Sequence, residues 1–155
     1  MSIKYTNFSN IEVGSASAGG DIKIGGAVTP KTITIAYAAS TTTDGIEATF
    51  TVVDAEGTAI SAIHTLNVWI SDDADGSGLT ATSASGALTA ATGTILTALT
   101  AKKHVIANTD ANGVLTLLLV DSANTADEYF VVQNPVNGRL ILGPATVATD
   151  YEGGA

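Results

Sequence analysis

The sequence predicts an all-β protein whose body is an antiparallel β-sandwich. After Pro30, apolar and polar residues alternate with a period of two in several short runs, which is typical of half-buried strands. Turn signals rich in Gly, Asn and Asp separate these runs at intervals of about 10 residues, as they do in sandwiches. Together the two observations indicate one domain of short strands, preceded by an extended N-terminal arm.

Residues 1–30 differ from the rest of the chain because five glycines interrupt them and no apolar period persists. The segment is too short and too rich in glycine to form a core of its own. We therefore expect an extended arm, in which Ile22 and Ile24 could form one short strand. The arm either packs back on its own domain or docks onto a neighbouring subunit. Its candidate anchors are the large apolar side chains of Tyr5, Phe8, Ile11 and Val13.

The first three strands of the body are predicted at residues 32–37, 46–52 and 65–71. In each of them every second residue is apolar. A turn at residues 41–45 joins the first two, and residues 54–57 end the second, because Asp caps turns and Gly supplies a positive φ. The third strand carries Trp69, the only tryptophan. The alternation of Trp69 and Tyr37 suits side chains of a sandwich core.

Residues 71–91 form a long connection of Gly, Ser, Thr, Ala and Asp. A connection of this length is expected to be functional or partly disordered rather than a simple link. Beyond it, Ile95, Leu96 and Leu99 are compatible with one or two helical turns, although the threonines between them weaken that prediction.

The last strands are predicted to form two hairpins. Residues 104–107 and 114–120 flank a turn that ends in Asn-Gly, a sequence that favours tight hairpins. Residues 114–120 are apolar at nearly every position, so we expect a central strand that is covered on both faces. Residues 129–132 and 139–142 flank a second turn that also ends in Asn-Gly.

Six or seven short strands in this order predict an antiparallel immunoglobulin-like β-sandwich. The predicted divisions are an arm at residues 1–30, a sandwich at residues 31–148 and a mobile tail at residues 149–155.

The composition favours a protein that works by assembly. Apolar residues make up 45% of the chain but charged residues only 14%, against roughly 25% in an average globular protein. The exterior must therefore consist largely of small neutral groups, which cost little to desolvate when another protein covers them. The net charge is −9 with only six Lys and Arg residues, so we expect no contact with nucleic acid phosphates.

The chain has no cysteine, which excludes disulfides, thiolate nucleophiles and cysteine-ligated zinc. Residues 1–7 lack the apolar stretch of a secretory signal, and the longest apolar run, at residues 114–120, is too short to span a bilayer. We expect a soluble protein that is made in the cytoplasm and has no membrane partner and no cofactor.

No pattern typical of catalysis occurs in the sequence, and we predict that the protein is not an enzyme. A serine hydrolase needs a histidine and a carboxylate beside its nucleophile, but the only histidines, His64 and His104, both lie at predicted strand starts. The sequence contains no Gly-x-Ser-x-Gly elbow and no P-loop.

One acidic cluster, at residues 71–78, has two alternative interpretations. Alternating carboxylates before a glycine can wrap a calcium ion. The cluster departs from the EF-hand pattern, because Ser71 occupies the first ligand position and Thr82 stands where the bidentate Glu belongs. A turn after the Trp69 strand needs the same Asp and Gly residues, so we favour a structural turn and assign no metal ligand.

Four motifs occur in a fixed order between residues 47 and 142. They are VVDAEG at 52–57, VWISDDADGSGLT at 68–80, KKHV at 102–105 and TDANG at 109–113, of which the second is the most specific. On these motifs the chain resembles a module that recurs in structural proteins of tailed phages.

The resemblance implies a non-enzymatic virion protein, most like a capsid decoration (cement) protein. Such proteins are small β-rich domains that sit as trimers on the outside of the capsid lattice. The expected partners are therefore the major capsid protein and further copies of this chain. Their N-terminal arms add a strand to the coat protein, a contact that uses main-chain hydrogen bonds and makes few demands on side chains.

The alternative is a tail-associated or surface-adhesion module that binds a glycan or a host surface. Sugar binding would require exposed aromatic side chains, for which the body offers Trp69, Tyr37, Tyr129 and Phe130.

Overall fold

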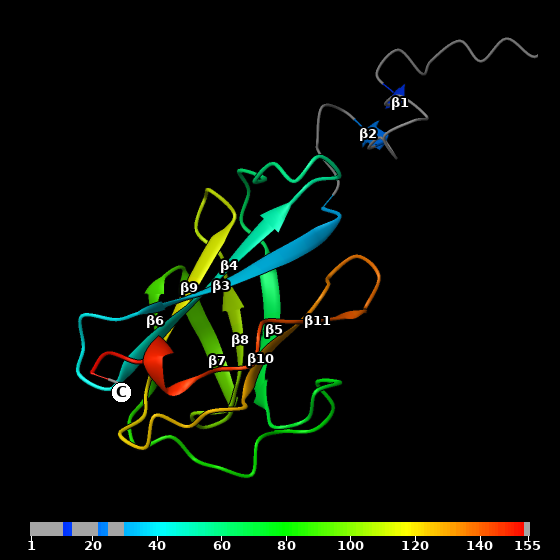
Figure 1. Ribbon diagram of the computed structural model, residues 1–155. Helices are drawn as coiled ribbons and strands as arrows, with labels where there is room; N and C mark the ends of the chain where they lie inside the picture. Colours follow the sequence, from blue (N-terminus) through cyan, green and yellow to red (C-terminus); the bar gives the residue numbers. More distant parts are fainter. Residues whose placement is uncertain (1–10, 14–21, 25–29, 154–155) are drawn as a thin grey trace, which may run out of the picture.

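The computed structural model describes residues 11–13, 22–24 and 30–153 of the 155-residue chain. The body consists of two antiparallel sheets that pack face to face as a sandwich (Figure 1). The four-stranded sheet has the order β3 (Thr32–Ala39), β4 (Gly45–Val53), β9 (Val114–Val120) and β6 (Leu88–Thr92). The five-stranded sheet has the order β11 (Leu140–Leu142), β10 (Tyr129–Gln133), β5 (Thr65–Ser71), β8 (His104–Asn108) and β7 (Thr94–Thr100). The predicted all-β sandwich is confirmed.

The core lies between the two sheets and is built from the inward residues of the alternating strands. On β4, for example, Ile46, Ala48, Phe50 and Val52 are all fully buried, as the period of two predicts. Phe130 of β10 stands at the centre, with its ring 6.4 Å from that of Phe50 and 5.5 Å from that of Tyr37. Other core residues include Ile33, Leu66, Val68, Ile70, Val105, Leu115, Leu117, Leu119 and Val132.

The spatial order of the strands matches that of a variable-type immunoglobulin domain. In such a domain the sheets have the orders A-B-E-D and G-F-C-C′-C″, and the two sheets here place β3-β4-β9-β6 opposite β11-β10-β5-β8-β7. The order along the chain differs, however. In an immunoglobulin variable domain strand C is followed by C′, C″ and D. Here the strand in the position of C, β5, is followed by strands in the positions of D (β6), C″ (β7) and C′ (β8). The reversal keeps every neighbouring pair antiparallel.

Two predictions for the middle of the chain were wrong. The segment that includes Ile95, Leu96 and Leu99 is strand β7 and not a helical turn. The long connection predicted at residues 71–91 ends earlier, at residue 87, because β6 begins at Leu88.

The predicted hairpin between β8 and β9 was also wrong, because these strands belong to different sheets. The Asn-Gly turn does form, with Gly113 at φ 77° and its N–H donating to Asp110 O at 3.1 Å. Asp110 closes the turn on itself, because its Oδ1 accepts from the N–H groups of Asn112 and Val114, each at 2.9 Å. A turn stabilised in this way can connect two sheets as well as two paired strands. The second predicted hairpin, β10 with β11, is confirmed.

The prediction of a mobile tail at residues 149–155 is wrong for residues 149–153, which are part of the body. A short 3₁₀ helix, η1 (Ala148–Asp150), leads to Tyr151, which is only 2% exposed. The Tyr151 hydroxyl donates to Thr125 O at 3.1 Å, and Glu152 exchanges backbone hydrogen bonds with the turn that precedes β4. The large apolar ring of Tyr151 explains the difference, because its burial stabilises the segment. Residues 154–155 lie outside the described residues.

In the predicted arm, β1 (Ile11–Val13) and β2 (Ile22–Ile24) form a separate two-stranded antiparallel sheet (Figure 1). The short strand expected at Ile22 and Ile24 is confirmed, whereas its partner strand was not predicted. Two of the proposed anchors, Ile11 and Val13, are in register with Ile24 and Ile22. The other two, Tyr5 and Phe8, lie outside the described residues.

Candidate interaction surface

Ionised side chains are nearly absent from the strands of the body. Among the nine strands from β3 to β11, only Glu47 on β4 carries a carboxylate, and no strand carries Lys or Arg. Every other charged residue between 30 and 153 lies outside the strands. The two sheet faces are therefore close to neutral, although the chain as a whole has a net charge of −9.

The outer face of the four-stranded sheet consists mainly of small neutral side chains. On β3, the outward residues Thr34, Ala36 and Ala38 are exposed. Between β4 and β9, the hydroxyls of Thr49 and Thr116 lie 3.1 Å apart and hydrogen-bond to each other. Such a face presents few unsatisfied polar groups, so its desolvation by a partner costs little.

Trp69 lies on the outer face of the five-stranded sheet and not in the core. Its neighbours on β5, Val68 and Ile70, point inward and are buried. The Trp69 indole N–H donates to Gly76 O at 3.0 Å, so the loop after β5 covers the ring. Tyr37, in contrast, packs against the core beside Phe130. Trp69 is therefore half-buried rather than available as a flat stacking surface.

The acidic cluster of residues 71–78 holds its own loop together. Asp75 Oδ1 accepts from the N–H of Ser77 at 2.8 Å, and Asp72 Oδ2 accepts from the N–H of Ala81 at 3.0 Å. The hydrogen bonds from Ser77 lower the pKa of Asp75. Within the described residues, no three acidic or histidine side chains converge as metal ligands. These contacts support the structural interpretation of the cluster.

The two histidines lie in unrelated surroundings. His104 Nε2 lies 2.6 Å from Asn67 Oδ1, and its ring meets Trp69 edge-on at 5.8 Å between ring centroids. His64 Nε2 is buried and has no hydrogen-bond partner among the described residues. Burial lowers the pKa of both imidazoles. The side-chain partner of His104 is thus an amide and not a hydroxyl that it could activate as a base.

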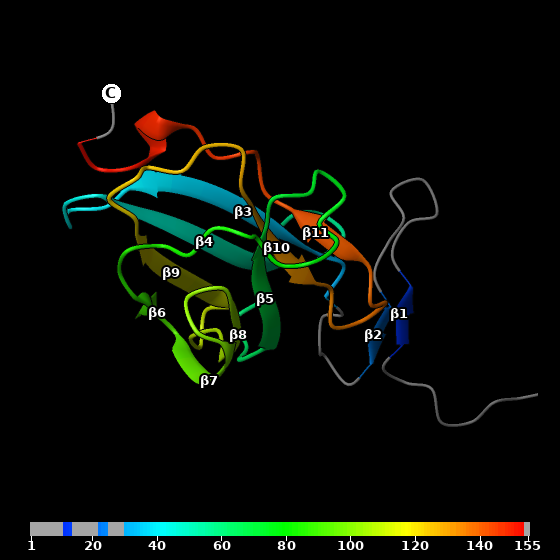
Figure 2. The same ribbon diagram turned by 90° about the horizontal axis from the view of Figure 1, so that it is seen from below.

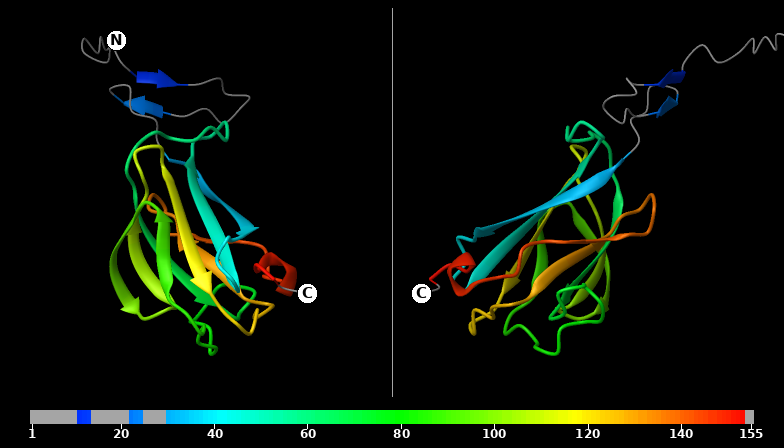
Figure 3. Two further views of the ribbon diagram at one scale, coloured as in Figure 1. Left: turned by 90° about the vertical axis from the view of Figure 1, so that its left-hand side faces the viewer. Right: turned by 45° about the vertical axis from the view of Figure 1, so that its right-hand side comes forward.

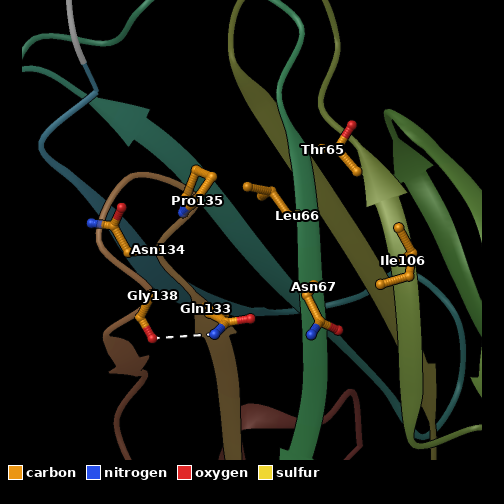
Figure 4. A pocket seen from close by; sticks show the side chains of 8 residues that line it. All are labelled: Thr65, Leu66, Asn67, Ile106, Gln133, Asn134, Pro135 and Gly138. Carbon is orange, nitrogen blue, oxygen red and sulfur yellow. Dashed lines mark hydrogen bonds between the residues drawn. The ribbon is translucent and has the colours of Figure 1, made fainter.

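A pocket of about 300 Å³ opens on the outer face of the five-stranded sheet, beside the β10–β11 turn (Figure 4). Asn67 of β5 and Gln133 of β10 are directly paired across the two strands and lie on its floor. Gln133 Nε2 also donates to Gly138 O at 3.2 Å. The remaining lining residues are Thr65, Leu66, Ile106, Asn134, Pro135 and Gly138. This arrangement offers amides and a small apolar surface, with no ionised side chain.

Residues 88–100 form a second unusual surface, which we call the β6–β7 margin. Here the chain passes from one sheet to the other through Gly93 alone, so that β6 and β7 form one continuous edge of the sandwich (Figure 2). Gly93 has φ +81°, and a Cβ at this position would lie 2.4 Å from Asn108 O, so only glycine fits. The sequence prediction missed this margin because it placed residues 88–91 in the long connection and found residues 95–99 compatible with helical turns.

Comparisons with known proteins identify no relative. No family model, no curated protein and no solved structure matches this chain. Within the described residues, no helix is long and apolar enough to cross a bilayer.

Proposed function

We propose that this protein is a non-enzymatic structural protein of a tailed-phage virion. In this proposal it decorates the outside of the capsid, where it binds the major capsid protein as a homo-oligomer, with a trimer as the expected form. The observation that carries the proposal is the near absence of ionised side chains from the strands of the body. Glu47 is the only charged residue in strands β3 to β11. The virion context comes from the resemblance to tailed-phage structural proteins at residues 52–57, 68–80, 102–105 and 109–113.

Neutral faces support an assembly role because a contact surface must lose its water. Covering an unpaired ionised side chain costs several kcal/mol, whereas hydroxyls that are already paired, such as Thr49 with Thr116, add little cost. On a lattice, many weak identical contacts act together through their high effective concentration. The charged residues outside the strands keep the free subunit soluble before it assembles.

The acidic balance also supports a protein partner. With six cations in the whole chain, and Lys102 and Lys103 already donating to backbone carbonyls of residues 80–85, little positive charge remains for phosphates. The surface of this protein is therefore more consistent with binding to a coat protein on the capsid exterior than with binding to packaged nucleic acid.

The first experiment locates the protein in the particle. Heads and tails from purified virions would be separated and analysed by mass spectrometry, and heads would be imaged by electron microscopy. We expect the protein on heads, with density at regular lattice positions. Its presence on tails alone would refute capsid decoration.

The second experiment tests the arm. Among the residues that the structure describes, the buried residues of the core begin at Ile33, so deletion of residues 2–30 leaves all of these in place. We expect the truncated protein to keep the Trp69 emission of the full chain but to lose co-sedimentation with heads. A full-length variant with Val136→Lys, an exposed position on the β10–β11 turn, serves as the control that keeps the arm. Unchanged head binding by the truncated protein would refute the arm as the docking element.

A second candidate function is supported by the pocket beside the β10–β11 turn. The pocket is lined by the side-chain amides of Asn67 and Gln133, which lie opposite each other on β5 and β10 (Figure 4). Amides are groups that hydrogen-bond sugar hydroxyls. A tail-associated adhesion module would bind particular glycans on an array and lose them with Gln133→Ala. An array on which the full chain binds nothing would remove this candidate.

A further inference from the structure

The β6–β7 margin has an open backbone edge along its whole length. Among the described residues, β7 is the last strand of the five-stranded sheet and pairs only with β8, while β6 is the last strand of the other sheet and pairs only with β9. Figure 3 shows this margin on the side of the sandwich away from β3. Free proteins usually protect such an edge with charged side chains, proline or β-bulges. Residues 88–100 contain no charged residue and no proline, so bulges are the protection against strand pairing that remains.

Two β-bulges in β7 turn additional side chains away from the core. Ile95 and Ala98 are in register with the buried Ala107 and Val105, three residues apart instead of two. Leu96 lies at the first bulge, between Ile95 and Thr97, and is 54% exposed. Leu99 lies at the second bulge, between Ala98 and Thr100, and is 55% exposed. A bulged edge twists away from continuous sheet extension. The margin is therefore suited to a contact made mainly by side chains, with the two leucines at its centre.

The charge pattern of the margin is compatible with a second copy of this chain. Residues 76–101 form the longest uncharged stretch of the chain, in a protein whose net charge is −9. Two copies repel each other where their acidic loops approach, and this stretch brings no charged side chain into a contact between them. The opposite margin differs, because Lys31 and Arg139 lie there, beside β3 and β11.

We infer that the β6–β7 margin is a contact between copies of this chain, packed around Leu96 and Leu99. This inference specifies the homo-oligomer of the proposed function, and it rests on that proposal only for the biological setting. The contact forms in solution and needs no coat protein. Its test can therefore fail or succeed independently of head binding.

The test measures self-association of the full-length chain by sedimentation velocity over a wide range of protein concentration. The variant Leu96→Lys/Leu99→Lys places like charges in the contact. The control Val136→Lys/Leu140→Lys makes the same change of net charge at exposed apolar positions near the opposite margin, which are 55% and 41% exposed. We expect the wild type and the control to associate alike, and the margin variant to associate more than about tenfold more weakly.

Two outcomes would overturn the inference. One is a margin variant that associates as well as the wild type. The other is a wild type that stays monomeric throughout; if this monomer loses head binding with Leu96→Lys/Leu99→Lys, the occupant of the margin is the coat protein. Trp69 emission checks that each variant folds. If the lysine variant does not fold, Leu96→Thr/Leu99→Thr removes the apolar contact while keeping residues that favour strands, and it is expected to weaken association as well.

Discussion

Glu128 is a carboxylate that the fold has taken out of water. Its side chain directly precedes β10, is only 5% exposed and accepts a hydrogen bond from Thr80 Oγ1 at 2.6 Å. Burial raises the pKa of Glu128, and the negative charges of Asp121 and Asp72 raise it further, against the lowering effects of Thr80 and Lys103. The folded protein therefore binds this proton more tightly than the unfolded chain does.

The raised pKa predicts how stability depends on pH. The stabilisation from the Glu128 proton is present below the pKa of the unfolded chain and is lost as pH rises through the higher pKa of the folded state. Glu128→Gln keeps an oxygen that can accept from Thr80 and cannot ionise. We expect the urea midpoint of Glu128→Gln, relative to wild type, to increase from pH 4 to pH 7.

The control for this measurement is Glu56→Gln, which removes an exposed carboxylate. Its midpoint is expected to follow that of wild type across the same range. A Glu128→Gln midpoint that falls relative to wild type as pH rises would contradict the raised pKa.

At the scale of elements, the loop after β5 acts as a cover for Trp69. Gly76 has φ +75°, and a Cβ there would lie 3.1 Å from side-chain atoms of Val131 and Leu142. Gly57 has a similar φ of +82° but nothing within 4 Å of the added carbon. A substitution at Gly57 therefore introduces backbone strain alone, whereas one at Gly76 introduces the same strain together with a packing conflict.

We predict that Gly57→Ala destabilises the protein by about 1 kcal/mol through backbone strain alone. Gly76→Ala adds the packing conflict on the outer face and should cost about 2–3 kcal/mol in total. Because Trp69 is the only tryptophan, its emission should move to longer wavelength with Gly76→Ala and stay unchanged with Gly57→Ala. Equal stability and equal emission in the two variants would show that the loop does not cover the ring.

The elements that could be predicted from the sequence are those with a regular period of two. β3, β4 and β5 lie where alternation predicts them. In β7 the large apolar residues Ile95, Leu96 and Leu99 were compatible with helical turns, because Leu96 and Leu99 occupy the two bulges and so fall at positions that one face of a helix would also bring together. An insertion in a strand can thus imitate a helical pattern.

Features that depend on long-range pairing were not accessible from the sequence. β5 pairs with β8 although two strands, β6 and β7, lie between them in the sequence, so this pairing leaves no local pattern. The same limit applied to the interaction surface. The uncharged stretch at residues 76–101 was visible in the sequence, but that it includes an open edge follows only from the strand order.

For the whole molecule, the decisive property is where the charges lie. The net charge of −9 resides almost entirely outside the strands, so it opposes every approach of two copies, including the one at the β6–β7 margin. Added salt screens this repulsion, because the Debye length falls from about 10 Å at 0.1 M to about 3 Å at 1 M.

We therefore predict that self-association of the wild type strengthens as NaCl is raised. The measurement is the sedimentation coefficient at one protein concentration in low and high salt. Weakening by salt would instead indicate that ion pairs hold the copies together. Leu96→Lys/Leu99→Lys should show little association under either condition.

The pairing of β3 with β4 has a mechanical consequence. The two strands share eight registered pairs, from Thr32 with Val53 to Ala39 with Ile46, and β3 is the first strand of the body after residue 30. Ladder hydrogen bonds lie perpendicular to the strands. A force that pulls residue 30 along the axis of β3 therefore shears the whole ladder at once, whereas a sideways force opens it one bond at a time. In the proposed capsid role, an arm that pulls in line with β3 would be the stiff arrangement, suited to restraining a shell that is under internal pressure.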